Sequence, residues 1–123
     1  MLLSSPMPPI TVYLKPTCTT CRNAVAELNE RGVQFESVDL FKTPPTVDEL
    51  RELCRKLGVG PREILRSKDP AYAAHDLGSG RHTDEQLLKL MAENPGLIQR
   101  PILVRGQKAV LARPVEKMDT LLR

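Results

Sequence analysis

Two cysteines, Cys18 and Cys21, have the spacing and the surroundings that thiol chemistry needs. They follow an apolar run, residues 10–14, that reads as a short buried strand, and they precede a segment of helical spacing that stops at Gly32. Cys18 therefore lies where a strand turns into a helix, beside free backbone N–H groups and the positive end of the helix dipole. Because such surroundings lower a thiol pKa from about 8.5 to roughly 3.5–7.5, we expect Cys18 to be a thiolate nucleophile at neutral pH.

The Cys-x-x-Cys spacing could serve redox chemistry, metal binding or structure. Between a strand and a helix it is typical of thioredoxin-like redox sites, and Cys21 lies within reach of Cys18, one helical turn on. A zinc site would need a second pair of ligands. The remaining cysteine, Cys54, stands alone, and His75 and His82 lack zinc-finger spacing, so no metal is expected. We therefore favour a redox or nucleophilic role over structural cysteines or a metal site.

Arginines at expected element boundaries could supply an anion site. Arg66 ends a short helix, Arg100 precedes Pro101, and Arg113 precedes Pro114. In thioredoxin-like folds the strand-initial proline that faces the active thiol is commonly cis, and Pro101 is the candidate for that position. A guanidinium held beside it would bind an oxyanion through two parallel hydrogen bonds. Each arginine alone could be an ordinary solvated side chain, but together with a thiolate the three predict an oxyanion site.

The other segments supply elements that can position these residues. Alternation of apolar and polar residues predicts a second strand over residues 33–40. An apolar stripe after the N-cap Thr46 predicts a helix that is closed by Gly58. Residues 67–81 are weakly patterned, which indicates short helix mixed with loop, and a capping box at residues 83–86 begins another helix.

The C-terminal third of the sequence predicts a hairpin and a last helix. Two apolar runs, residues 101–105 and 108–112, are joined through Gly106-Gln107, and Pro114 can begin a helix. The order of elements is then β-α-β, helices, β-β-α. We expect an α/β, thioredoxin-like fold with a mixed four-stranded sheet, helices on both faces, and a helical insertion between the two halves.

Length, charge and composition exclude several classes of function. The 123 residues fit one domain over residues 10–123, preceded by a flexible, proline-rich extension over residues 1–9. A net charge of +3 and the absence of tryptophan argue against nucleic-acid binding. No apolar run approaches the ~20 residues of a membrane span, and the N-terminus lacks a signal-peptide pattern. We therefore expect a cytoplasmic monomer with free thiols and no bound cofactor.

Taken together, these motifs resemble the arsenate reductase ArsC family, in the glutaredoxin-like branch that also contains the Spx regulators. The resemblance runs from about residue 10 to the C-terminus. It is carried by the Cys18 loop with Arg22-Asn23, by residues 64–68, by Asn94-Pro95-Gly96 leading to Arg100-Pro101, and by Ala112-Arg113-Pro114. The resemblance implies that Cys18 attacks arsenate, that the three arginines cradle the oxyanion, and that arsenite leaves. Thioredoxin, or glutathione with glutaredoxin, would then restore the thiol as an external donor.

Three positions distinguish members of this branch. Spx-type regulators, which use the cysteine pair as a redox switch and dock on RNA polymerase, lack the final Arg-Pro, so Arg113 favours a reductase. Many glutaredoxin-linked reductases have no cysteine at the position of Cys21, which could resolve the intermediate here in place of glutathione; both routes stay open. Similar reductases can carry a histidine at the position of Leu14, and the adjacent Lys15 is more simply a solvated lysine than a substitute for it.

Other residues with reactive or polar side chains have plainer explanations. Cys54 lies on an apolar helical stripe, so we expect a buried, inert thiol. Thr19 and Thr20 could serve simply as helix caps. Alternatively, their backbone N–H groups could face a bound anion. His75 and His82 fall in weakly patterned sequence and are assigned no role.

Overall fold

The computed structural model describes residues 8–122. The extension expected over residues 1–9 lies outside the described residues except for Pro8 and Pro9, which directly precede the first strand. Within this described range, every helix is too short or too polar to span a bilayer.

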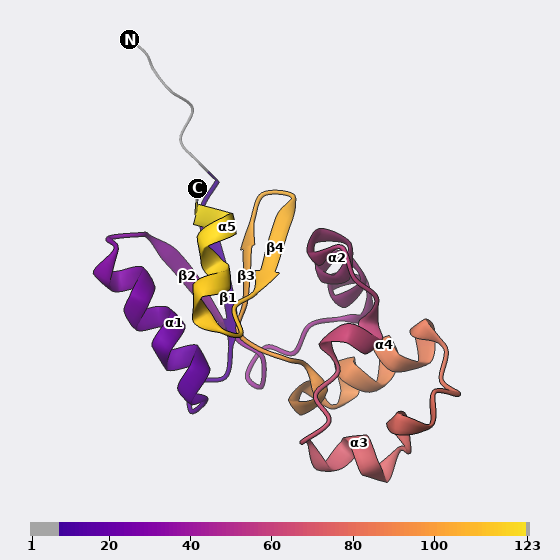
Figure 1. The fold of residues 1–123 in the computed structure, drawn as a ribbon. Helices are drawn as coiled ribbons and strands as arrows, with labels where there is room; N and C mark the ends of the chain where they lie inside the picture. The colour runs from indigo at the N-terminus through magenta and orange to yellow at the C-terminus, as the bar shows by residue number, and fades with distance from the viewer. Residues whose placement is uncertain (1–7, 123) are drawn as a thin grey trace.

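Four strands form one mixed sheet in the order β2-β1-β3-β4 (Figure 1). Their bounds are β1 (Ile10–Leu14), β2 (Phe35–Asp39), β3 (Ile102–Arg105) and β4 (Lys108–Leu111). β1 is parallel to β2 and antiparallel to β3, and β3 is antiparallel to β4. The prediction of a mixed four-stranded sheet, in a thioredoxin-like order of elements, is confirmed.

Helices cover both faces of the sheet, as the sequence predicted. The α-helices are α1 (Thr19–Glu30), α2 (Val47–Leu57), α3 (Pro70–Ala74), α4 (Asp84–Glu93) and α5 (Asp119–Leu122). The 3₁₀ helices are η1 (Pro61–Ile64), η2 (Leu77–Ser79), η3 (Pro95–Leu97) and η4 (Val115–Met118). Figure 1 shows α1 and α5 on one side of the sheet and α2 and α4 on the other. The segments from α2 to η3 form the predicted helical insertion.

The two-residue period of β1 divides the hydrophobic core into two clusters. Ile10, Val12 and Leu14 are buried with residues of α1 and α5, whereas Tyr13 packs against the cluster that α2 and α4 build. β1 is therefore a central strand that is packed from both faces. Because it is held on both sides, the loop that follows it, which carries Cys18, begins from a fixed position.

Three elements differ from the sequence-based expectation. β2 is shorter than residues 33–40, because the N–H of Val33 donates to the carbonyl of Leu28 at 3.0 Å and belongs to the Schellman end of α1. The helix opened by Pro61 is a 3₁₀ helix, and the last helix begins as the 3₁₀ helix η4 before α5 follows. Such short segments commonly adopt 3₁₀ geometry, which makes its first hydrogen bond one residue earlier than an α-helix.

Candidate active site

Cys18 is the N-cap residue of α1, and its sulfur takes the place of the usual capping oxygen. Its backbone is extended, and its Sγ accepts a hydrogen bond from the N–H of Cys21 at 3.4 Å. The Nε of Arg22 donates to the carbonyl of Pro16 at 3.2 Å, which ties the first turn of the helix back to the loop. Cys18 is thus held where the helix start can stabilise a thiolate, as the strand-to-helix spacing predicted.

The surroundings of Cys18 favour its ionised form. Partial burial opposes ionisation, but the N–H and thiol of Cys21 and the guanidinium of Arg100 outweigh it and lower the Cys18 pKa from 9.0 to about 7. A substantial fraction of the thiol is therefore a thiolate at neutral pH. The arrangement can supply a nucleophile without a general base.

Cys21 has the opposite character. Its side chain is only 1% exposed and packs in the cluster beneath α1. Burial, and then the neighbouring Cys18, raise its pKa to about 12. Both cysteines are free thiols in this structure. One member of the pair is therefore ready to attack, while the other stays protonated beside it.

A cavity of about 290 Å³ lies beside Cys18 and collects the predicted substrate-binding residues. Its lining consists of Lys15, Thr17, Cys18, Thr19, Thr20, Arg66, Arg100 and Arg113. Thr19 and Thr20 contribute the first turn of α1, where the leading N–H groups of a helix have no partner inside the helix. The cavity therefore combines a nucleophile, a helix start and several cations.

Three of the lining residues, Arg66, Arg100 and Arg113, form what we call the arginine site. They lie far apart in sequence, after η1, before β3 and after β4. None of them forms an ion pair within residues 8–122, whereas the arginines of the helix surfaces, such as Arg31 and Arg51, are paired with carboxylates. Guanidinium groups that converge without a carboxylate leave positive charge available for an anionic ligand.

Arg100 is the most buried of these cations. It is 4% exposed and is the one buried charged side chain among the described residues. Its Nη1 donates to the carbonyls of Gly96 at 3.2 Å and Ile98 at 3.3 Å. Its Nε has no hydrogen-bond partner in the described part of the chain. A buried donor without a partner is costly, so this N–H is poised for an acceptor on a ligand.

Hydrogen bonds to backbone carbonyls connect the segments that carry the arginines. The Nη1 of Arg113 donates to the carbonyl of Arg100 at 2.9 Å. The N–H of Arg66 donates to the carbonyl of Leu97 at 2.7 Å, which ties the end of η1 to η3. The three positions are thus fixed relative to one another by these hydrogen bonds as well as by the core.

Both Arg-Pro peptide bonds in this region are cis. The Arg100–Pro101 bond has the isomer that the sequence analysis expected, and the Arg113–Pro114 bond has it as well, which was not expected. No local signal in the sequence separated these two Arg-Pro pairs.

Two further residues belong to the surroundings of the cavity. Lys15, which the sequence suggested was only solvated, lines it. Its Nζ lies 4.9 Å from the ring centroid of Phe41, a residue that sequence reasoning did not single out. For Phe41 the sequence offered only one signal, an isolated aromatic residue just after an expected strand. Leu14, by contrast, is buried in the core and does not line the cavity.

The remaining candidates keep their plain explanations. Cys54 is buried on α2, and burial raises its pKa, as expected of an inert thiol. His75 and His82 do not line the cavity. Within residues 8–122, no three His, Cys, Asp or Glu side chains gather as metal ligands.

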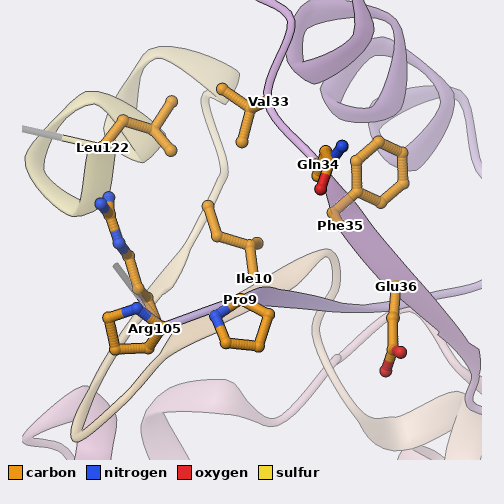
Figure 2. A pocket seen from close by; sticks show the side chains of 9 residues that line it. Pro9, Ile10, Val33, Gln34, Phe35, Glu36, Arg105 and Leu122 are labelled. Atoms are coloured by element: carbon orange, nitrogen blue, oxygen red, sulfur yellow. The ribbon is translucent and has the colours of Figure 1, made fainter. Parts of the chain in front are cut away.

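A larger cavity, about 560 Å³, lies at the opposite end of β1 from Cys18 (Figure 2). Pro9, Ile10, Phe35 and Leu122 contribute much of its lining. Its one cation, Arg105, donates to the carbonyl of Leu121 at 2.6 Å. Because this cavity contains neither a cysteine nor a cluster of cations, it offers no counterpart to the chemistry beside Cys18.

Comparison with known proteins gives a consistent result. The model described as the ArsC family matches residues 13–121. Over 94% of its length, the chain is 35% identical to an arsenate reductase of Neisseria meningitidis, of which it covers 100%. It is 39% identical, over 92% of its length, to an arsenate reductase of Yersinia enterocolitica, of which it covers 80%. A solved arsenate reductase from Vibrio cholerae superposes with a TM-score of 0.88 at 32% identity, covering 94% of this chain and 98% of that one.

Proposed function

The chain belongs to the ArsC family, and on this premise we propose that it is an arsenate reductase in which Cys18 attacks arsenate bound in the arginine site. One observation carries the proposal. A thiol with a pKa of about 7 borders a small cavity in which three arginines lack carboxylate partners within residues 8–122. Such a site suits a nucleophilic attack on an oxyanion, because the cations offset both the charge of the substrate and its repulsion of the thiolate.

In the first step, the sulfur of Cys18 forms a bond to arsenic and an arsenate oxygen leaves as hydroxide or water. The arginine site neutralises the remaining oxygens, and the leading N–H groups of α1 provide further donors. The unpartnered Nε of Arg100 is a suitable donor to one of these oxygens. Arsenic is still pentavalent at this stage.

In the second step, another thiolate attacks the Cys18 sulfur and the sulfur–arsenic bond breaks. The electron pair of that bond stays on arsenic, which leaves as arsenite, and the two thiols become a disulfide. We propose Cys21 as this second thiol. Burial and the neighbouring Cys18 raise its pKa, and the contribution of Cys18 is removed once that sulfur is bonded to arsenic. Cys21 would then ionise more readily when it is needed.

An external thiol donor must reduce the disulfide before another turnover. With Cys21 as the resolving thiol, the product is a disulfide within the chain, which is a suitable substrate for thioredoxin. With glutathione as the resolving thiol, the product is a mixed disulfide that glutaredoxin would reduce. The rival prediction from sequence, a redox-switch regulator on RNA polymerase, receives no support from the relatives reported above.

The test is arsenate-dependent oxidation of NADPH by the purified protein, coupled separately to a thioredoxin system and to a glutathione–glutaredoxin system. We expect turnover in at least one system by the wild type and by the Cys54→Ala control, and none by a folded Cys18→Ser variant. Alanine variants of the arginine site should each lose about tenfold or more in kcat/KM, because a charge-assisted hydrogen bond contributes roughly 1.5–3 kcal/mol. Absence of arsenate-dependent turnover in both systems would refute the proposal.

A further inference from the structure

Phe41 stands out on the surface of this protein. It is 43% exposed and is the one large hydrophobic side chain exposed among residues 8–122. Its ring lies 4.9 Å from Nζ of Lys15 and 5.9 Å from Cζ of Arg100, measured to the ring centroid. A cation within about 6 Å of a ring centroid is attracted by the negative face of the ring. Phe41 therefore connects two cations that both line the cavity beside Cys18.

The position of the Phe41 ring is fixed from two sides. Its backbone N–H donates to Oδ1 of Asp39 at 2.9 Å, in a turn that directly follows β2. Its Cζ lies where a methyl group on Gly96 would be only 3.5 Å away, so the ring packs against the backbone of that glycine. The carbonyl of Gly96 in turn accepts a hydrogen bond from Arg100. The ring thus belongs to the same local structure as the arginine site.

Lys15 is held in a way that is unusual for a surface lysine. Long lysine side chains ordinarily extend their ammonium group into water. The side chain of Lys15 is instead half-buried, lines the cavity and has its ammonium over the ring, with no carboxylate partner within residues 8–122. It adds a fourth cation to the arginine site.

We propose that Lys15 is a further substrate contact of the oxyanion cavity, and that Phe41 is the positioning residue that holds its ammonium there. This inference rests on the proposed function and deepens it, because it concerns the affinity of the same site for its oxyanion. A lysine that is free to rotate would spend most of its time away from the anion. The ring restricts it to the cavity wall before substrate arrives, which is the advantage of preorganisation.

The structure separates this role from activation of the nucleophile. Burial raises the Cys18 pKa, and the groups that lower it are Cys21 and Arg100 rather than Lys15. Loss of Lys15 or of the Phe41 ring should therefore weaken oxyanion binding and raise KM for arsenate. The pH dependence of Cys18 alkylation and kcat at saturating arsenate should change little.

The test measures arsenate binding by calorimetry in a Cys18→Ser background, where no turnover occurs. We expect Lys15→Met to raise the dissociation constant about tenfold, the effect of losing one charge-assisted contact. Phe41→Leu should raise it two- to fivefold, as expected for an exposed cation–π interaction. Phe41→Tyr, which keeps the ring, should stay within twofold of the background. Lys42→Met is the matched control, since this exposed lysine is adjacent to Phe41 but does not line the cavity.

The double variant tests whether Phe41 acts through Lys15. Adding Phe41→Leu to Lys15→Met should cause no further loss of affinity. An unchanged dissociation constant for Lys15→Met overturns the substrate contact, and an undiminished effect of Phe41→Leu in the double variant overturns positioning through Lys15. A wild type that binds arsenate but does not reduce it refutes only the proposed function, whereas normal turnover with silent Lys15 and Phe41 variants refutes only this inference. Melting curves of all variants verify that each is folded.

Discussion

The two thiols of the candidate active site, Cys18 and Cys21, differ in their tendency to ionise, and this difference can be measured directly. Only a thiolate reacts with iodoacetamide, and the pKa of Cys18 is lowered to about 7 whereas that of Cys21 is raised to about 12. We expect alkylation of Cys18 in the folded protein to reach half its maximal rate near pH 7 and to fall as pH decreases below that. Mass spectrometry of peptides after timed labelling gives the profile for each cysteine.

The unfolded protein supplies the control for this profile. In denaturant, Cys18 should behave like an ordinary thiol, with half-maximal alkylation near pH 8.5. An identical profile for folded and unfolded protein would mean that the helix start and Arg100 do not stabilise the thiolate.

A second prediction concerns the fate of Cys21 after one turnover. If it resolves the arsenic intermediate, arsenate alone should convert the reduced protein into a form with a Cys18–Cys21 disulfide, which is about 2 Da lighter because both thiol hydrogens are lost. Cys21→Ser should then stop turnover with thioredoxin. Mass spectrometry after arsenate treatment, without glutathione, makes the measurement. If no such linkage forms, and Cys21→Ser is silent in the glutaredoxin-coupled assay, glutathione is the resolving thiol.

At the scale of single residues, a candidate could be singled out from the sequence where it has a local signature. Cys18 was recognisable because a strand, a turn and a helix start are all encoded within a few residues of it, and the structure places it at the N-cap. Lys15 and Phe41 were not recognisable, since the contact between them joins two loops separated by the whole of α1 and β2. A lysine beside a loop proline has no signature until its tertiary neighbour is known.

At the scale of elements, Gly96 in η3 offers a sharp prediction. A methyl group at this position would lie 2.1 Å from Oδ2 of Asp69 and 3.5 Å from the Phe41 ring. The Asp69 carboxylate cannot easily move, because its Oδ1 accepts the N–H of Ala71 as the N-cap of α3. We expect Gly96→Ala to cost about 1–3 kcal/mol of unfolding free energy. It should also weaken arsenate reduction, since the Gly96 carbonyl accepts a hydrogen bond from Arg100.

Gly60 provides a matched control in the same insertion. Its φ is −88°, and a methyl group there would contact nothing within 4 Å. Gly60→Ala should therefore be neutral or slightly stabilising, because it reduces the freedom of the unfolded chain. Urea unfolding curves of the two variants make the comparison. Equal effects of the two substitutions would contradict the close approach at Gly96.

The elements with strong end signals were the ones predicted well. The capping box that joins Thr46 to Glu49 and the left-handed Gly58 bound α2 where the sequence placed it. β2 and the C-terminal helix were predicted less accurately. The period-two pattern of residues 33–40 includes Val33, whose N–H donates to the end of α1. In the C-terminal segment, no residue before Asp119 distinguished an α-helix from the 3₁₀ helix η4. Backbone hydrogen bonds, rather than side-chain pattern, decided these boundaries.

At the scale of the whole molecule, the fold assembles a site that no segment contains. The three arginines were singled out from the sequence because each stands at an element boundary, and all three line the cavity beside Cys18. Their convergence depends on β3 pairing with β1 and on the hydrogen bond between Arg66 and Leu97, which are long-range features. An oxyanion in the arginine site would therefore bridge the helical insertion, which carries Arg66, and the β-hairpin half, which begins after Arg100.

This bridging predicts that an oxyanion stabilises the entire fold. A ligand that binds only the native state at about one hundred times its dissociation constant adds about 2.7 kcal/mol, and for a domain of this size each kcal/mol raises the unfolding midpoint by roughly 4 °C. We expect saturating arsenate to raise the midpoint of Cys18→Ser protein by about 10 °C in scanning fluorimetry. The rise should be nearly absent in Cys18→Ser/Arg100→Ala, while Arg31→Ala, which removes an exposed arginine paired with Glu27, should leave it intact. Sodium chloride at equal ionic strength separates a specific site from general screening. A similar rise with chloride, or an undiminished rise without Arg100, would show that the arginine site does not bind the anion as a unit.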